Sequence, residues 1–418
     1  MQLYKYIINP YILYSIVWMF TLSIYPLGWT SLYPNLTLGL VLFICITSLL
    51  SFIWGIYKIK TNSFHIVNIY PNKKYYKKLL KVSIITIIFL ALEFVIFGSI
   101  PLINYILGNA NLLGNYNEFG IPVVHVIVMT AYEFIQIFCF HCFLRCKDRI
   151  IKKKFLILYL GNMIVLSLVM NRGILMYTIF GSILIFFMVK KRILRYIAKL
   201  FLFVFVIFWL FGLLGNLRTG SNIEEGKELI LELGGATNSF RESIVPNELF
   251  WPYIYITSPL SNVQYNIKNT EVDFNERDLV SFFVNDCLPQ TISKRLDMPY
   301  KKGKLINDSL NVGSVYMRPY ANLGWLGMVL IYIFMFVFIE INIRLISRNS
   351  PLFPSLIVII DLIVIFNVFD NMFIFSGLVP AVLIAIYLAG IKYFPRRLHI
   401  SNKRYSMKFN RNNTINDK

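Results

Sequence analysis

The sequence has few charged residues for its length. Only 15% of its 418 residues are charged, whereas ordinary soluble domains carry about 25%. Hydrophobic residues make up 57% of the chain, and the mean hydropathy is +0.63. This composition excludes an ordinary water-soluble protein. It predicts an all-α, polytopic integral membrane protein.

Cysteine and histidine are also scarce. Of the five cysteines, only Cys287 lies between residues 218 and 318, so no disulfide is implied in that segment. The cysteines near residue 142 supply a single C-x2-C pair, Cys139 and Cys142, which is half of what a zinc site of that spacing requires. We therefore expect neither a metal nor a cofactor.

Long apolar runs are what the sequence has in abundance. A helix that crosses the hydrocarbon core of a bilayer needs roughly 20 apolar residues. The runs predict ten membrane spans, near residues 11–26, 36–57, 82–106, 122–143, 155–170, 173–189, 196–216, 319–343, 353–370 and 372–391. Two of the runs are long enough to form helical hairpins, and they turn at Asn171-Arg172-Gly173 and at Asp370-Asn371.

Basic residues fall on alternate connections between these spans. Lysine and arginine mark cytoplasmic loops, and outside residues 218–318 only Arg172 lies on the opposite side. This pattern places both termini in the cytoplasm of a multi-pass plasma (inner) membrane protein. The predicted divisions are residues 1–216 with spans one to seven, an extracytoplasmic loop 217–318, residues 319–393 with spans eight to ten, and a basic tail 394–418.

The net charge of +20 follows from the same distribution. Residues 218–318 hold 11 basic and 13 acidic residues, whereas the rest of the chain holds 30 basic and 8 acidic ones. The excess of positive charge is therefore a topology signal and does not indicate nucleic-acid binding. A basic cytoplasmic face also favours contact with anionic membrane lipids.

The large loop has the composition of a folded segment. Residues 224–233 have the pattern of an amphipathic helix. Residues 247–265 are apolar and aromatic, but Pro252 and Pro259 interrupt them, so we expect this segment at the membrane interface and not across the membrane. Its rings would stack on sugars or pack onto the spans.

Several ionisable and polar residues fall inside predicted spans, where they are costly and often functional. Glu93, Glu133 and His125 suggest either a proton or ion path or hydrogen bonds between helices. A second polar set would line a cavity or cap a helical hairpin, and it comprises Asp361, Asn367, Asp370 and Asn371.

Arginines at the outer surface are the strongest indication of chemistry. Arg172 lies in a tight turn, while Arg218 and Arg318 flank the large loop, and Arg241 lies within it. Guanidinium groups grip phosphate and pyrophosphate bidentately, so we expect these residues to converge on such a group. The alternatives are snorkelling or helix capping for Arg172 and a surface ion pair for Arg241.

Four features together resemble the bacterial oligosaccharide repeat-unit polymerases that build O-antigens and capsules. They are the Asn171-Arg172-Gly173 turn, the long loop, the segment Tyr255–Asn262, and the loop exit, which runs from Arg318 through Gly324 to Gly327. The family typically has phenylalanine before the first of these glycines, where this chain has Leu323. The layout covers nearly the whole chain, although its motifs are short.

The resemblance implies a GT-C-like fold and a glycosyltransferase that joins undecaprenyl-pyrophosphate-linked oligosaccharides outside the membrane. Arg172, Arg218 and Arg318 would then be catalytic, and Glu242 or Asp286 is a candidate for the base. The implied substrate-binding residues are Arg241, Tyr255, Asn262, Tyr320 and Asn322. A chain-length regulator and a flippase are the further partners that it implies.

Two other functions fit the same layout. A glycan ligase of the O-antigen type would use a histidine in the large loop, and this loop has none. A lipid-linked oligosaccharide flippase or transporter commonly has internal repeats and short loops, and neither is visible here.

Overall fold

The computed structural model describes residues 4–61, 63–64, 69–107, 120–121, 123–190, 223–272, 275–346, 350–374 and 377–389, with nine single positions between 202 and 216. Within these residues the protein is helical and contains no β-strand, which confirms the predicted all-α class. The helices are α1 (Tyr4–Ile7), α2 (Pro10–Ile24), η1 (Tyr25–Leu27), α3 (Leu38–Lys60), α4 (Lys73–Phe97), α5 (Pro101–Ile106), α6 (Val124–Arg145), α7 (Arg149–Leu168), α8 (Arg172–Val189), α10 (Ile223–Leu233), α11 (Asn238–Arg241), η4 (Asn247–Leu249), α12 (Phe250–Asn269), α13 (Glu276–Cys287), α14 (Gln290–Leu296), α15 (Met317–Leu345), α16 (Phe353–Phe366) and α17 (Leu378–Ala389).

Among the described residues, five helices are long and apolar enough to cross a membrane, namely α2 with η1, α3, α4, α6 and α15. The apolar helices α8, α16 and α17 are shorter. Large apolar side chains stay exposed along α3 and α4, among them Leu38, Leu49, Val95 and Ile96. Exposed apolar surface on this scale favours a lipid environment over water. These features indicate a membrane protein.

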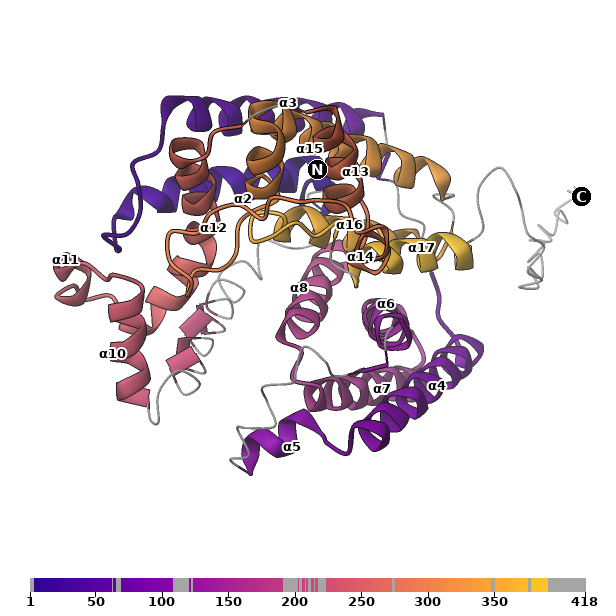
Figure 1. The fold of residues 1–418 in the computed structure, drawn as a ribbon. Helices are drawn as coiled ribbons and strands as arrows, with labels where there is room; N and C mark the ends of the chain where they lie inside the picture. The colour runs from indigo at the N-terminus through magenta and orange to yellow at the C-terminus, as the bar shows by residue number, and fades with distance from the viewer. Residues whose placement is uncertain are drawn as a thin grey trace, which may run out of the picture.

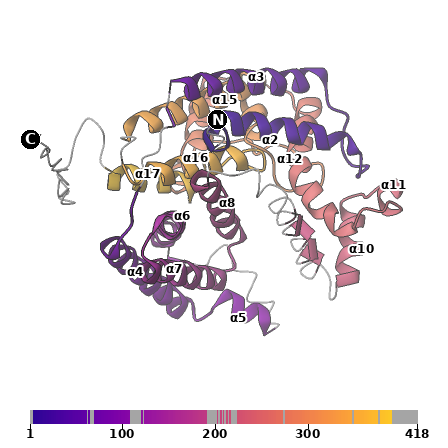
Figure 2. The same cartoon turned by 180° about the vertical axis from the view of Figure 1, so that it is seen from behind.

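Helix α16 lies at the centre of the fold. Its residues from Phe353 to Val364 are all buried, as expected for a helix that is hydrophobic on every side. It packs against α2, α8, α6 and α17. In both views α2, α3 and α15 form one group of helices, and α4, α6, α7 and α8 form another (Figures 1 and 2). Helix α16 therefore joins the two groups.

Both predicted helical breaks are present. Helix α7 ends at Leu168 and α8 begins at Arg172, where the Asn171 side chain caps α8 by accepting a hydrogen bond from the Ile174 N–H at 3.2 Å. The second break is longer, because α17 begins only at Leu378. Asparagine side chains fold the connection between α16 and α17.

In that connection, Asn367 Oδ1 accepts the Met372 N–H at 2.9 Å, and Asn371 Oδ1 accepts the Phe373 N–H at 3.0 Å. These two members of the predicted polar set therefore act as hairpin caps. Asp361 is different, since both of its buried carboxyl oxygens lack a hydrogen-bond partner in the described structure.

Two helices differ from the sequence prediction. Residues 82–106 do not form one helix, because α4 ends at Phe97 and Gly98 adopts a left-handed φ of 61° before α5 begins. Conversely, α12 is a continuous helix that runs through Pro259. Its buried face, which includes Ile254, Leu260 and Val263, holds it in place despite the hydrogen bond that proline removes.

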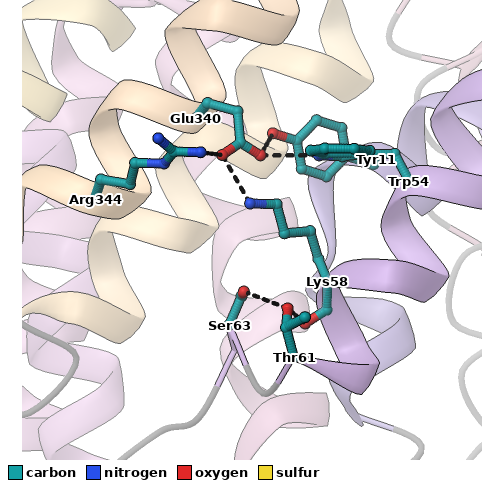
Figure 3. Close-up of polar contacts among 7 residues, drawn as sticks. All are labelled: Tyr11, Trp54, Lys58, Thr61, Ser63, Glu340 and Arg344. Atoms are coloured by element: carbon teal, nitrogen blue, oxygen red, sulfur yellow. Dashed lines mark hydrogen bonds and ion pairs between the residues drawn. The ribbon is translucent and has the colours of Figure 1, made fainter.

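Glu340 fixes the C-terminal part of α15. The sequence analysis did not single out this residue. Its carboxylate accepts hydrogen bonds from Tyr11 at 2.6 Å, Trp54 at 2.9 Å and Lys58 at 2.7 Å, and Arg344 lies 3.2 Å away (Figure 3). These partners come from α2, α3 and α15 itself. A carboxylate surrounded by this many donors is well satisfied in a nearly buried position, so it clamps the three helices together.

The first turns of α15 are set at an angle to the rest of the helix. Gly324 has φ 60° and ψ −142°, a backbone conformation that essentially only glycine adopts. At Gly327 a Cβ atom would lie 2.1 Å from the Pro319 carbonyl oxygen, so no side chain fits there either. Both glycines of the predicted loop exit are therefore required by the kink, which orients the turn that carries Arg318.

Residues 223–318 contact two other connections. An antiparallel bridge joins Thr30, between α2 and α3, to Ala236. In the α16–α17 connection, the Ile374 carbonyl accepts the Gln290 N–H at 2.9 Å. The described part of the large loop thus contacts both the connection between α2 and α3 and the connection between α16 and α17.

Candidate functional site

A cluster of ionisable side chains lies where α13, α15 and the α16–α17 connection meet. We call Asp286, Tyr300, Arg318 and Asp370 the Asp286 cluster. Asp286 lies near the end of α13, Arg318 lies in the first turn of α15, and Tyr300 lies in the chain between them. The Asn371 amide donates to the Asp286 main-chain oxygen at 2.9 Å and so attaches the connection to α13.

The Asp286 carboxyl group is fully buried. Its Oδ1 atom accepts a hydrogen bond from the Tyr300 hydroxyl at 2.7 Å, and its Oδ2 atom has no partner in the described structure. Burial raises the pKa of Asp286 to about 7, although Tyr300 and Arg318 act in the opposite direction. The group therefore populates both its acid and its base form near neutral pH.

Arg318 is the cation of this cluster. Its guanidinium carbon lies 5.9 Å from the centre of the Tyr300 ring, within the range of a cation–π contact. Asp286 and Asp370 both interact with it electrostatically. A planar guanidinium that is held against a ring keeps its N–H groups at its edge, where they can meet an anion.

Asn322 holds the chain that carries Tyr300. Its amide donates to the main-chain oxygens of Lys301 and Arg318, both at 2.9 Å, and its carbonyl accepts the Lys301 N–H at 3.1 Å. Since Lys301 follows Tyr300 directly, this bracing keeps Tyr300 beside Arg318. Asn322 was predicted to bind substrate, and here it is engaged within the protein.

Two of the other predicted substrate-binding residues lie on α12. Tyr255 stacks on Phe369, next to Asp370, with ring centres 5.5 Å apart and an angle of 4° between the rings. Asn262 is buried, and its side chain bonds the main chain of Ile306, Leu310 and Val312. Tyr255 thus lies near the cluster, whereas Asn262 anchors the chain before α15.

Tyr320 is nearly buried and packs edge-on against Trp325, with ring centres 5.8 Å apart. Its position two residues after Arg318 places it on the same kinked end of α15.

Arg241 lies away from the cluster. It forms an ion pair with Glu228 at 3.1 Å, which is the surface pairing that was the alternative for this residue. Figure 1 shows α11 well away from α13 and α14, so Arg241 does not lie beside the Asp286 cluster. Glu242, a candidate base, is exposed at the end of α11 and is equally remote.

The other two predicted arginines are only partly placed. Arg172 begins α8, directly after the cap formed by Asn171, and its side chain lies outside the described residues. Arg218 lies outside them entirely. Their predicted convergence with Arg318 remains a prediction.

The acidic residues of the predicted spans form a separate set. Glu93 pairs with His125 across α4 and α6 at 2.8 Å and accepts the Ile121 N–H at 3.2 Å. Glu133, further along α6, is fully buried, and neither of its carboxyl oxygens has a partner in the described structure. Glu93 and His125 thus form a polar contact between two helices. The Glu133 and Asp361 carboxyl groups make no such contact within the described residues.

The Asp286 cluster can transfer a proton and stabilise negative charge. A carboxyl group with a pKa near the working pH is suited to acid–base catalysis, and a fixed guanidinium stabilises a developing anion. Sequence reasoning had named Asp286 and Arg318 separately and had missed Tyr300. Tyrosine in a lysine-rich turn gives no sequence signal of such a role, because the pairing depends on the fold of the loop.

Protein-family models, curated proteins and solved structures were compared with this chain, and none of them matches it.

Proposed function

We propose that the protein is a glycosyltransferase that polymerises undecaprenyl-pyrophosphate-linked oligosaccharide repeat units on the extracytoplasmic face of the plasma membrane. The product would be an O-antigen or a capsular polysaccharide. The single observation that carries this proposal is the Asp286 cluster, in which a buried carboxyl group and an arginine meet where the large loop rejoins an apolar helix.

The contacts between connections support the topology of this proposal. The ten-span arrangement puts the α2–α3 connection, the large loop and the α16–α17 connection on the outer side. These are the segments joined by the Thr30–Ala236 bridge and by the hydrogen bond from Gln290 to Ile374. At the other side, Lys58 and Arg344 share Glu340, as expected for two basic cytoplasmic ends.

In the proposed reaction, a sugar hydroxyl of the acceptor attacks the anomeric carbon of the donor. A new carbon–oxygen bond forms, and the bond between the anomeric carbon and the pyrophosphate oxygen breaks. Arg318 stabilises the charge that develops on the departing undecaprenyl pyrophosphate. Arg172 and Arg218 are proposed to share this role at the same membrane surface.

The hydroxyl proton leaves through Tyr300 and Asp286. Tyr300 is partly exposed and donates to the buried Asp286 carboxylate. As the acceptor hydroxyl loses its proton to the Tyr300 oxygen, the Tyr300 proton moves to Asp286. Tyr300 therefore stays neutral, the Asp286 carboxylate is neutralised, and the negative charge ends on the departing pyrophosphate. The ionised carboxylate is the form that accepts this proton.

The experiment is polymerisation by the purified protein in detergent, with lipid-linked repeat units as the only substrate. Replacing Arg318 or Arg172 with alanine should lower the rate by about 100- to 1000-fold, as expected for losing one group that stabilises the leaving anion. Arg295→Ala is the matched control, because Arg295 is an exposed arginine of the same loop. We expect single lipid-linked units to accumulate in the first two variants and normal chain-length ladders in the control.

Normal ladders in the Arg318→Ala and Arg172→Ala variants would contradict the proposal. So would a failure of wild-type protein to join repeat units in detergent.

A lipid-linked oligosaccharide transporter is the second candidate function. The buried carboxyl groups of Glu133 and Asp361, which have no hydrogen-bond partner among the described residues, favour it, because ionisable groups inside apolar helices commonly mark ion or proton paths. A transporter would need an ion gradient and would leave the repeat units unjoined, so the detergent assay separates the two functions.

A further inference from the structure

Helices α4 and α7 are neighbours and run in the same direction. The rings of Tyr76 and Phe155 meet edge to face with their centres 5.7 Å apart, and the Asn162 amide donates to the Ser83 hydroxyl at 3.0 Å. The two contacts are seven residues apart on each helix, so the helices are parallel and in register. Both also pack on α6 (Figures 1 and 2). The first turns of α4 and α7 therefore lie close to the same level.

The first turns of both helices are basic and exposed. The acidic residue next to them, Asp148, is engaged as the cap of α7, because its Oδ1 atom accepts the N–H groups of Ile150 at 2.8 Å and Ile151 at 3.1 Å. We call the exposed lysines of these turns the α4–α7 basic patch. Within the described residues, none of them forms an ion pair. The patch comprises Lys74, Lys77, Lys78, Lys81, Lys153 and Lys154.

The basic residues around Glu340 provide a contrast. Lys58 lies 2.7 Å from the Glu340 carboxylate and Arg344 lies 3.2 Å from it, so the protein itself supplies their counter-charge. The α4–α7 basic patch has no equivalent of Glu340 among the described residues. A counter-charge for its lysines therefore has to come from outside the chain.

Both helices become apolar and stay exposed directly beyond the patch. Ile88 of α4 is 54% exposed, and Ile157 and Ile164 of α7 are 69% and 67% exposed. Just before α7, the Lys147 ammonium lies 4.5 Å from the centre of the Tyr70 ring, and tyrosine is enriched where a membrane meets water. The order of a basic turn followed by an exposed apolar face matches the headgroup and the chains of a phospholipid.

We propose that the α4–α7 basic patch binds the phosphate of an anionic phospholipid, whose chains lie along the exposed apolar faces of α4 and α7. Lysine ammonium groups bind phosphate as point charges. Each basic residue near an anionic membrane surface strengthens attachment by about fivefold. Phosphatidylcholine carries its own cation beside the phosphate, so the patch should select phospholipids with a net negative charge. This site is independent of the proposed polymerisation.

The test begins with the full-length wild-type protein in a neutral detergent. Native mass spectrometry should give a lower apparent Kd for phosphatidylglycerol than for phosphatidylcholine with the same chains. Glycerol 3-phosphate, which supplies the phosphate without the chains, should not displace the lipid. In phosphatidylcholine nanodiscs, phosphatidylglycerol with a diazirine in one chain should label α4 and α7 more than α3, relative to a phosphatidylcholine probe with the same diazirine.

The variant Lys77→Gln/Lys78→Gln/Lys81→Gln should raise the apparent Kd for phosphatidylglycerol by about 10- to 100-fold, because three positive charges of the patch are lost. It should leave phosphatidylcholine binding unchanged. Arginine at the same three positions keeps the charge and should keep the affinity. Thermal unfolding of both variants in detergent checks that they fold, and the wild-type measurements decide the proposal even if the glutamine variant does not.

The matched control is Lys268→Gln/Lys294→Gln/Arg295→Gln, which removes three exposed positive charges from α12 and α14 and should leave the Kd unchanged. Four results would each overturn the proposal: equal Kd values for the two lipids, displacement by glycerol 3-phosphate, relative labelling of α3 equal to that of α4 and α7, or the same loss of affinity in the control as in the glutamine variant of the patch. An unchanged Kd in a folded glutamine variant, or lost binding in the arginine variant, would overturn it as well.

Discussion

Replacing Asp286 with asparagine should remove polymerisation and, above pH 7, stabilise the fold. Burial raises the pKa of Asp286 from 3.8 to about 7. Each unit corresponds to about 1.4 kcal/mol, so ionising this buried carboxyl costs the folded state about 4 kcal/mol relative to the unfolded chain. Asparagine avoids that cost, and the cost already includes the favourable bond from Tyr300 to the charged carboxylate. The expected gain is therefore about 4 kcal/mol.

The pH dependence follows from the direction of the shift. Below pH 4 the carboxyl is protonated in both the folded and the unfolded protein, so the charge cost is absent. Between pH 4 and 7 the unfolded chain ionises first, and the wild-type protein loses stability as the pH rises. The gain from asparagine should therefore be partial at pH 5 and nearly complete at pH 8.

The assay is unfolding in detergent at pH 5 and pH 8, together with polymerisation at each pH. Wild-type polymerisation should rise through about pH 7, since the ionised carboxylate accepts the proton, and the variant should stay inactive. Asp308→Asn, which changes an exposed carboxyl of the same loop, should alter neither property. An Asp286→Asn protein that is active, or one that is less stable than wild type at pH 8, would refute the reasoning.

Three further predictions concern positions that shape the site and the fold. Gly324→Ala should lower the free energy of unfolding by about 1–3 kcal/mol and reduce polymerisation, because the φ of 60° at Gly324 orients the turn that carries Arg318. Gly161→Ala changes an open helical position and should not lower the free energy of unfolding. Equal effects of the two substitutions would contradict this account of the kink. Glu340→Ala should lower the free energy of unfolding by about 3 kcal/mol, because it leaves Lys58 nearly buried without its ion-pair partner. Arg344→Ala should lower it by less than about 1 kcal/mol, because Arg344 is 70% exposed. A larger loss of stability for Arg344→Ala than for Glu340→Ala would contradict the role of Glu340 as a clamp. Asn322→Ala should reduce polymerisation with little effect on the apparent KM, because it frees the chain that holds Tyr300; unchanged turnover would show that this bracing is unnecessary.

Much of the helical layout was predictable, because apolar runs must match the thickness of a bilayer. The break at Asn171 and the helix at residues 223–233 follow from local sequence, since an asparagine cap and an amphipathic repeat act within a few residues. The continuity of α12 through Pro259 did not follow, because contacts from other helices outweigh the local cost of proline.

The candidate site was predictable only in part. Arg318 stood out because it flanks the large loop next to a predicted span, and the two glycines after it belong to the loop exit that carries the resemblance. The pairing of Tyr300 with Asp286 joins residues 14 apart that are separated by α14 and two turns, so no periodic pattern encodes it. Glu340 was hidden for a similar reason, since its partners lie on α2 and α3, more than 280 residues away in the sequence.

The most direct test of the central claim is a chain-length analysis of lipid-linked glycan. Wild-type protein in detergent, without an ion gradient, is given lipid-linked repeat units as its only substrate. The account predicts a ladder of joined units and release of undecaprenyl pyrophosphate, both lost in Arg318→Ala and retained in Arg295→Ala. Unjoined repeat units in the wild-type reaction, or an unchanged ladder in Arg318→Ala, would contradict it.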